Sequence, residues 1–298
     1  MATEVTDTII KGLYTNPVFS QLMRRNLDKQ SVWYDLVNHK YEDALKSKGD
    51  RVVIYQAGDI TLRDYVKGED MTFDDPEGNK IEVELSQQKY FGFSLEDIDV
   101  KQSEIKGLGE KYIDRAQTTI TLAKDSFIAT KIWDGLSSDN LFESVAITKD
   151  NVYNLLTRLM ARLSWASAVK ANGTGYDGKR PWLVVDPDVL GVILQAPETT
   201  SATESGFKTT REGTVARLAG FDIKVSNNSD EKADTRRIIA GTTEGFAYVD
   251  QIAKTKVQPA EKRFATNYSG LYLYGGDVIQ EKALAGVPVT LPSLQTGA

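Results

Sequence analysis

The chain has 298 residues, of which 41% are hydrophobic and 26% charged, so it is long enough for one large domain or two ordinary ones. Its net charge of −6 argues against a protein whose main task is to grip phosphate backbones, because that binding needs an excess of lysine and arginine. The absence of cysteine excludes disulfides, thiol nucleophiles and thiolate metal sites.

The first residues carry no basic and apolar signal-peptide pattern, and no apolar run approaches the ~20 residues of a membrane span. Residues 15–30, "TNPVFSQLMRRNLDKQ", predict a short amphipathic helix. Its adjacent cations Arg24 and Arg25 either lie on a solvated face, which is the simpler interpretation, or contact a partner.

Residues 49–68, "GDRVVIYQAGDITLRDYVKG", predict two β arms around a turn at Gly58-Asp59. Few positions are apolar, and both arms are made hydrophilic by Arg51, Gln56, Asp59, Arg63, Asp64 and Lys67. An isolated two-stranded hairpin is only marginally stable in water. This hairpin is therefore expected to lean on another part of the chain or on another molecule.

The next segments predict a strand and a long helix. Ile81, Val83 and Leu85 alternate with polar residues, which indicates a strand with one buried face. The aromatic cluster Tyr90, Phe91 and Phe93 is expected in the core. The stretch from residue 109 to about 135 predicts one helix of about 25 residues, roughly 38 Å long at 1.5 Å per residue, with an apolar stripe at Ile113, Ala116, Ile120, Ala123 and Phe127.

The second half predicts an α/β unit followed by an extended tail. A helix is expected over residues 148–169, with Thr148 as N-cap and a buried stripe at Val152, Leu155, Leu156, Leu159 and Leu163. A buried strand at 181–185 precedes a helix with Asp186 as N-cap and Pro187 at its first position. The remaining expectations are a loop at 197–213, strands at 221–226 and 237–241, a short helical stretch at 244–252 and mostly extended chain at 254–289.

No catalytic set emerges from the residues. The single histidine, His39, cannot build a Ser-His-Asp triad or a histidine metal site, and a surface or linker position is expected for it. The glycine pattern at 173–178 follows a helix and precedes a strand, which is the wrong context for a dinucleotide fingerprint. Asp186 and Asp188 lie at a strand end where α/β enzymes bind ligands, but helix capping is the favoured interpretation. No cofactor is predicted.

The order of parts resembles a tailed-phage major capsid protein of the Hong Kong 97 fold. The resemblance is carried jointly by "GDRVVIYQAGDITLRDYVKG", "QQKYFGFSLEDID", "RPWLVVDPDVLGVIL", "LAGFDIKVSNN" and "EKRFATNYSGLYLYGGDVIQEKAL". It implies a mixed α+β fold with an N-terminal arm (1–48), an extended β-hairpin loop (49–80), a peripheral domain with a long spine helix (81–145 and 252–283) and an axial α/β domain (146–251 and 284–298).

The same resemblance implies a non-enzymatic protein that self-assembles, through pentamers and hexamers, into the icosahedral shell enclosing the double-stranded DNA of a tailed bacteriophage. Assembly in the host bacterial cytoplasm, a portal partner, no membrane and no sequence-specific DNA binding are expected. The loop would contact a neighbouring subunit through Arg51, Tyr55, Asp59, Arg63 and Lys67. A separate scaffolding protein is expected, because residues 1–48 leave little room for a fused scaffold, and Arg24 and Arg25 are its expected contact.

Three alternatives stay open at this point. An encapsulin, a cellular nanocompartment that shares the capsid fold, would hold cargo protein instead of a genome. An α/β enzyme with a site at Val185 and Asp186 lacks a histidine and a nucleophile context. A DNA-binding structural protein is disfavoured by the net charge.

Overall fold

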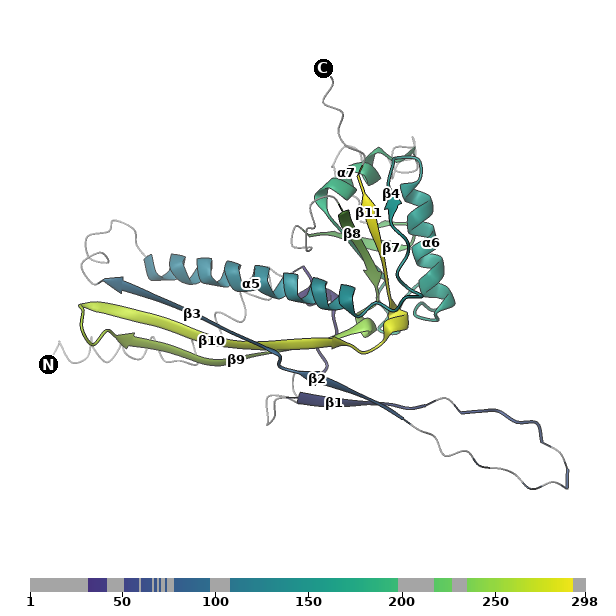
Figure 1. Ribbon diagram of the computed structural model, residues 1–298, viewed down its shortest axis with the longest axis horizontal. Coiled ribbons are helices and arrows are strands. Elements are labelled where there is room, and N and C mark those ends of the chain that lie inside the picture. The colour runs from purple at the N-terminus through teal and green to yellow at the C-terminus, as the bar shows by residue number, and fades with distance from the viewer. Residues whose placement is uncertain are drawn as a thin grey trace, which may run out of the picture.

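The computed structural model describes residues 32–41, 51–58, 60–65, 67–68, 70, 73, 78–96, 108–197, 217–226 and 235–291. Within these ranges the chain forms three sheets and three α-helices, a mixed α+β arrangement as predicted (Figure 1). A two-stranded ribbon, a three-stranded sheet under a long helix, and a six-stranded sheet with two shorter helices succeed one another in space.

The ribbon pairs β1 (Arg51–Gln56) with β2 (Asn79–Glu84) in antiparallel register, so that Val52 lies opposite Val83. The predicted turn at Gly58-Asp59 is therefore wrong, because the returning arm begins only at Asn79. Strand register is fixed where a common face can be buried. Ile81 and Val83 supply that apolar face as predicted, whereas residues 60–65 belong to no strand.

The three-stranded antiparallel sheet has the order β3 (Gln87–Glu96), β10 (Ala265–Val278), β9 (Phe246–Pro259). β9 replaces the helical stretch predicted at 244–252, of which only Glu244 and Gly245 belong to a 3-10 turn (Thr243–Gly245). Pairing with β10 overrides the local pattern, since consecutive residues Phe246, Ala247, Tyr248 and Val249 are all buried. Tyr90 on β3 is 84% exposed rather than in the core, because it faces the side opposite to Phe91.

The long helix α5 (Leu108–Asp134) runs along this sheet, which confirms the helix predicted at 109–135 (Figure 1). Its most buried face is offset from the predicted stripe, whose members are only half-buried. The buried positions include Ile128, Ala129 and Ile132, and the polar residues Gln117, Thr121, Lys124 and Asp125. The apolar spacing in the sequence predicted a stripe at the edge of the buried face of α5. It missed the centre of that face because polar side chains occupy part of the centre.

Lys124 is a fully buried cation that joins four segments of the chain. Its Nζ lies 3.1 Å from Oδ2 of Asp250 on β9, and the Tyr272 hydroxyl on β10 donates to the same oxygen at 2.7 Å. Nζ also lies 3.7 Å from the ring centroid of Tyr34, in the 3-10 turn η1 (Tyr34–Leu36). This network fastens η1 to the helix and to the sheet beneath it.

Replacing Asp250 with asparagine is expected to lower the free energy of unfolding by about 3–5 kcal/mol, because it leaves the Lys124 charge buried without its counter-ion. Urea titration followed by circular dichroism measures the change. The control is Lys40→Gln, which removes an exposed pair to Glu244 at the same 3.1 Å distance and should change stability by less than about 1 kcal/mol. Equal effects of both variants would contradict this account of Lys124.

The six-stranded mixed sheet forms the other large layer. Its order is β4 (Val145–Ala146), β11 (Leu284–Thr290), β8 (Thr235–Gly241), β5 (Trp182–Val185), β7 (Phe221–Val225) and β6 (Arg217–Leu218). The strands predicted at 181–185, 221–226 and 237–241 are confirmed, as is the extended chain near both β10 and β11. The loop predicted at 197–213 lies outside the described residues except for Pro197.

Two helices cover one face of this sheet. α6 (Val152–Trp165) buries Val152, Leu155, Leu156, Leu159 and Leu163 as predicted, and α7 (Pro187–Gln195) adds Val189 and Ile193. The N-cap of α6 is Asn151 and not Thr148, because residues 148–151 form a separate turn closed by the Asn151 side chain. α7 begins as predicted, with Asp186 as N-cap and Pro187 at its first position.

The opposite face of the six-stranded sheet packs on the long helix. Trp182 and Val184 alternate with Leu183 and Val185 along β5, so that each pair faces a different core. Trp182 and Val184 meet Trp33, Ile128 and Ile132 in a second cluster. The two large sheets are therefore joined through one continuous apolar contact, from which the ribbon projects (Figure 1).

Candidate inter-subunit surface

One face of the β1–β2 ribbon packs against other parts of the same chain. Val52, Ile54 and Ile81 pack on a small buried cluster formed by Val83, Ala247, Val249 and Ile279. The ribbon is therefore stabilised at its base by its own chain, through β9 and Ile279, the residue after β10. None of the described residues between β1 and β2 belongs to that cluster.

The other face of the ribbon is exposed and polar. Arg51 pairs with Glu82 at 3.1 Å, an ion pair in which both side chains remain largely accessible. Tyr55 is also exposed, and the Lys80 Nζ lies 5.5 Å from its ring centroid. These cross-strand pairs fix the ribbon's register and each contributes little stability, typically below about 1 kcal/mol.

The chain between the two strands exposes large apolar side chains, a feature that the sequence analysis did not single out. Leu62 is 97% exposed and Phe73 88%, and Ile60 and Tyr65 are also mostly accessible. The described residues of this loop run outward from the ends of β1 and β2 and away from both larger sheets (Figure 1). Apolar side chains gathered on one projecting segment are typical of an interaction surface.

The predicted contact residues occupy different places. Arg51 and Tyr55 lie on β1, while Arg63 and Lys67 lie exposed in the loop that follows it. Asp59, Arg24 and Arg25 lie outside the described residues. The apolar members Ile60 and Leu62 could have been found from their alternation in "DITLRD", which places both on one side of an extended chain.

The other candidate residues have structural partners. Arg236 lies 3.8 Å from Asp186 and 3.0 Å from Asp188, so both carboxylates at the end of β5 face a cation. His39 is half-buried, and its ring packs against those of Tyr34 and Tyr248. Residues 173–178 form part of the loop between α6 and β5, as expected for a connection.

Two further tests concern metals and membranes. Among the residues that the structure describes, no three histidine, aspartate or glutamate side chains gather in a way that could hold a metal ion. In the same ranges, no helix combines the length and the apolar character needed to cross a membrane.

Comparison with known proteins gives matches in structure only. No family model and no curated protein matches the sequence. A solved structure described as Mycobacterium phage Che8 matches with 25% identity and a TM-score of 0.73, covering 90% of this chain and 93% of that one. The capsid of cyanophage P-SCSP1u matches with 12% identity and a TM-score of 0.67, covering 82% and 84% of the two chains.

A virus-like particle from Pyrococcus furiosus also matches, with 13% identity and a TM-score of 0.51, over 91% of this chain and 98% of that one. These three matches cover between 82% and 91% of the chain. The chain therefore shares the fold of these phage structures, which is the Hong Kong 97 fold that the sequence resemblance predicted.

Proposed function

We propose that this chain is the major capsid protein whose copies form the icosahedral head shell around the double-stranded DNA of a tailed bacteriophage. The observation that carries the proposal is the near full-length likeness to the phage Che8 chain. The acidic balance agrees with a shell wall that encloses DNA without binding it tightly, because tight binding to phosphates needs an excess of cations.

In this proposal the regions of the chain have separate tasks. Residues 1–48 are the N-terminal arm, and residues 49–80 are the extended loop. Residues 81–145 and 252–283, with α5 as the spine helix, form the peripheral domain. Residues 146–251 and 284–298 form the axial domain, which would gather around the axis of each pentamer or hexamer.

The extended loop is the proposed contact with a neighbouring subunit, through Arg51, Tyr55, Asp59, Arg63 and Lys67. Its exposed apolar residues Ile60 and Leu62 support this task, since a neighbour could bury them. Ten extended residues span roughly 33 Å, which is long enough to cross onto a second subunit. Arg51 already pairs with Glu82 of its own chain, so its guanidinium would have to interact with Glu82 and with the neighbouring subunit at the same time.

The proposed partners besides further copies are a portal protein and a separate scaffolding protein. One subunit must bend differently in pentamers and hexamers, so shell curvature needs an external control. Arg24 and Arg25 would bind an acidic surface of the scaffold. Reversing both charges should weaken scaffold binding, with an effect that shrinks at high salt, and should leave the subunit's melting temperature unchanged.

The second candidate is an encapsulin-type compartment, favoured by the match to the Pyrococcus furiosus particle. The experiment that separates the two is to purify native particles, digest with nuclease and extract what remains protected. Protected double-stranded DNA of uniform length supports the phage head. Particles that hold one cargo protein and no protected DNA would support the compartment instead.

A further inference from the structure

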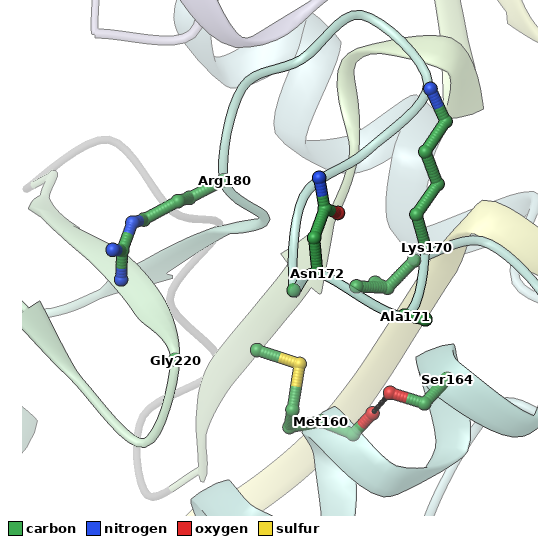
Figure 2. Close-up of a pocket in the computed structure, with 9 residues that line it drawn as sticks. Met160, Ser164, Lys170, Ala171, Asn172, Arg180 and Gly220 are labelled. Carbon is green, nitrogen blue, oxygen red and sulfur yellow. Dashed lines mark hydrogen bonds between the residues drawn. The ribbon is translucent and has the colours of Figure 1, made fainter.

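A basic pocket lies where the end of α6 meets the turn between β6 and β7. Its volume is about 550 Å³, and its lining includes Met160, Val169, Lys170, Asn172, Arg180 and Gly220. Figure 2 shows Met160 on the helix side of this pocket, with Lys170 and Arg180 on either side of Asn172. The pocket thus combines an apolar thioether with two exposed cations.

Gly220 permits the close approach that gives the pocket its shape. Its φ is +88°, and a Cβ at this position would lie 2.6 Å from Cε of Met160. A residue with a side chain would therefore push Met160 out of its position and strain the turn.

A second pocket of about 450 Å³ adjoins the first and shares Arg180 with it. Its lining contributes three more cations, Lys179, Arg217 and Lys224, against two carboxylates. One of these, Asp222, is already paired with Arg217 at 3.1 Å. Within the described ranges, no carboxylate forms an ion pair with Lys179, Arg180 or Lys224. We call the two together the basic double pocket, defined by Lys170, Lys179, Arg180, Arg217 and Lys224.

The chain carries a segment of complementary chemistry. Residues 69–77 read Glu-Asp-Met-Thr-Phe-Asp-Asp-Pro-Glu, with five acidic residues, no basic residue and one aromatic in the middle. Phe73 is 88% exposed. An aromatic side chain flanked by carboxylates is complementary to a pocket lined by Met160 and Val169 and by the cations Lys170 and Arg180. The ring would bury apolar surface against Met160 and Val169, and the flanking carboxylates would form charge-assisted contacts with the two cations.

We propose that residues 69–77 of one subunit dock on the basic double pocket of a second copy, with Phe73 in the pocket beside Met160. This inference rests on the proposed shell function, which brings two copies together. The described part of the loop runs away from its own six-stranded sheet, so the acceptor is another copy (Figure 1). A nucleic acid on the same cations is disfavoured by the acidic chain and by the apolar floor.

The first test uses photo-crosslinking in assembled full-length protein. Phe73 is replaced by benzoylphenylalanine, and mixed particles of isotopically light and heavy chains are irradiated and digested. Crosslinks between light and heavy peptides from residues 160–180 or 217–224 support the proposal. The same probe at Tyr65, which is exposed but not flanked by consecutive acids, is the matched control.

Intact shells with Phe73 crosslinked to other protein regions would overturn the docking inference and leave the shell function standing. Crosslinks from Lys170 or Arg180 to nucleic acid, obtained with 260-nm irradiation of native particles, would overturn it in favour of phosphate binding.

The second test does not depend on assembly. A fluorescent peptide of residues 67–78 is titrated with the full chain, and binding is measured by anisotropy. The double variant K170E/R180E should bind at least tenfold more weakly, and the F73A peptide should lose a similar factor. Reversing Lys254 and Lys256, exposed on β9, is the control and should leave binding unchanged. Equal affinity for the wild-type chain and K170E/R180E would refute the proposal even if shells form.

Discussion

A subunit in which residues 57–78 are replaced by an Asn-Gly turn is expected to fold normally and to form no closed shells. Gln56 lies opposite Asn79, so a two-residue turn can join β1 to β2 without changing their register. The apolar contact between the ribbon and β9 is kept. What disappears is the exposed loop, and with it the contact that a neighbour would make with Ile60, Leu62 and Phe73.

The measurements are thermal unfolding and electron microscopy of the same preparation. The melting temperature should stay within a few degrees of the wild type, because none of the described residues of this loop is buried. A loop of equal length built from glycine and serine is the control that separates loss of length from loss of side chains, and it should also fail to close shells. Normal particles from either variant would show that the loop is not a required contact.

The register of the ribbon decides where this deletion must begin and end. A deletion of residues 50–67, chosen from a turn at Gly58-Asp59, would remove all of β1 and leave β2 without its partner. Val83, which is fully buried, would lose the cover of Val52 and Ile54. Such a variant would test the stability of the subunit as well as its assembly.

Elements with a clear periodicity could be predicted from the sequence. α5, β5 and α7 lie within one residue of their expected bounds, because their apolar spacing or capping residues are local signals. α6 was also predicted, but it is four residues shorter at each end than the predicted range 148–169. The stripe on α6 was correct at every position, since each member is a leucine or valine that packs on one sheet.

Elements whose state depends on distant partners could not be predicted in the same way. β9 contains consecutive aromatic and aliphatic residues, which fit a buried helix or a strand equally well until its pairing with β10 is known. The partner of β1 lies beyond an exposed loop, and loop length leaves no local signal. The contact of Lys124 with Asp250 joins positions 126 residues apart, so a lysine at the centre of a buried face could not be foreseen.

The same limit applies to the candidate surface. The polar residues Arg51, Arg63 and Lys67 stand out in the sequence, and they suggested the loop as a contact. Leu62 and Phe73 are exposed because the described part of the folded chain places no apolar cluster against them, and the sequence alone does not reveal this. The basic double pocket likewise gathers residues from the loop before β5 and from strands β6 and β7, which β5 and α7 separate from that loop in the sequence.

Ile128→Asp is expected to abolish folding, with a loss of more than about 4 kcal/mol in the free energy of unfolding. Ile128 is fully buried in the cluster that joins α5 to Trp33 and Trp182. An aspartate there would lose the apolar contact and bury a carboxylate among apolar side chains. Since this cluster connects the two large sheets, the failure should affect the whole subunit and not only the helix.

The matched control lies six residues away on the same helix. Leu122 is 47% exposed, so Leu122→Asp keeps its carboxylate in water and should cost about 1 kcal/mol or less. The half-buried stripe members Ile120 and Phe127 should give intermediate losses, because an aspartate there can still reach solvent. Soluble expression and cooperative urea unfolding rank the four variants. An Ile128→Asp subunit that is soluble and melts cooperatively near the wild-type temperature would show that the buried face of α5 has been placed wrongly.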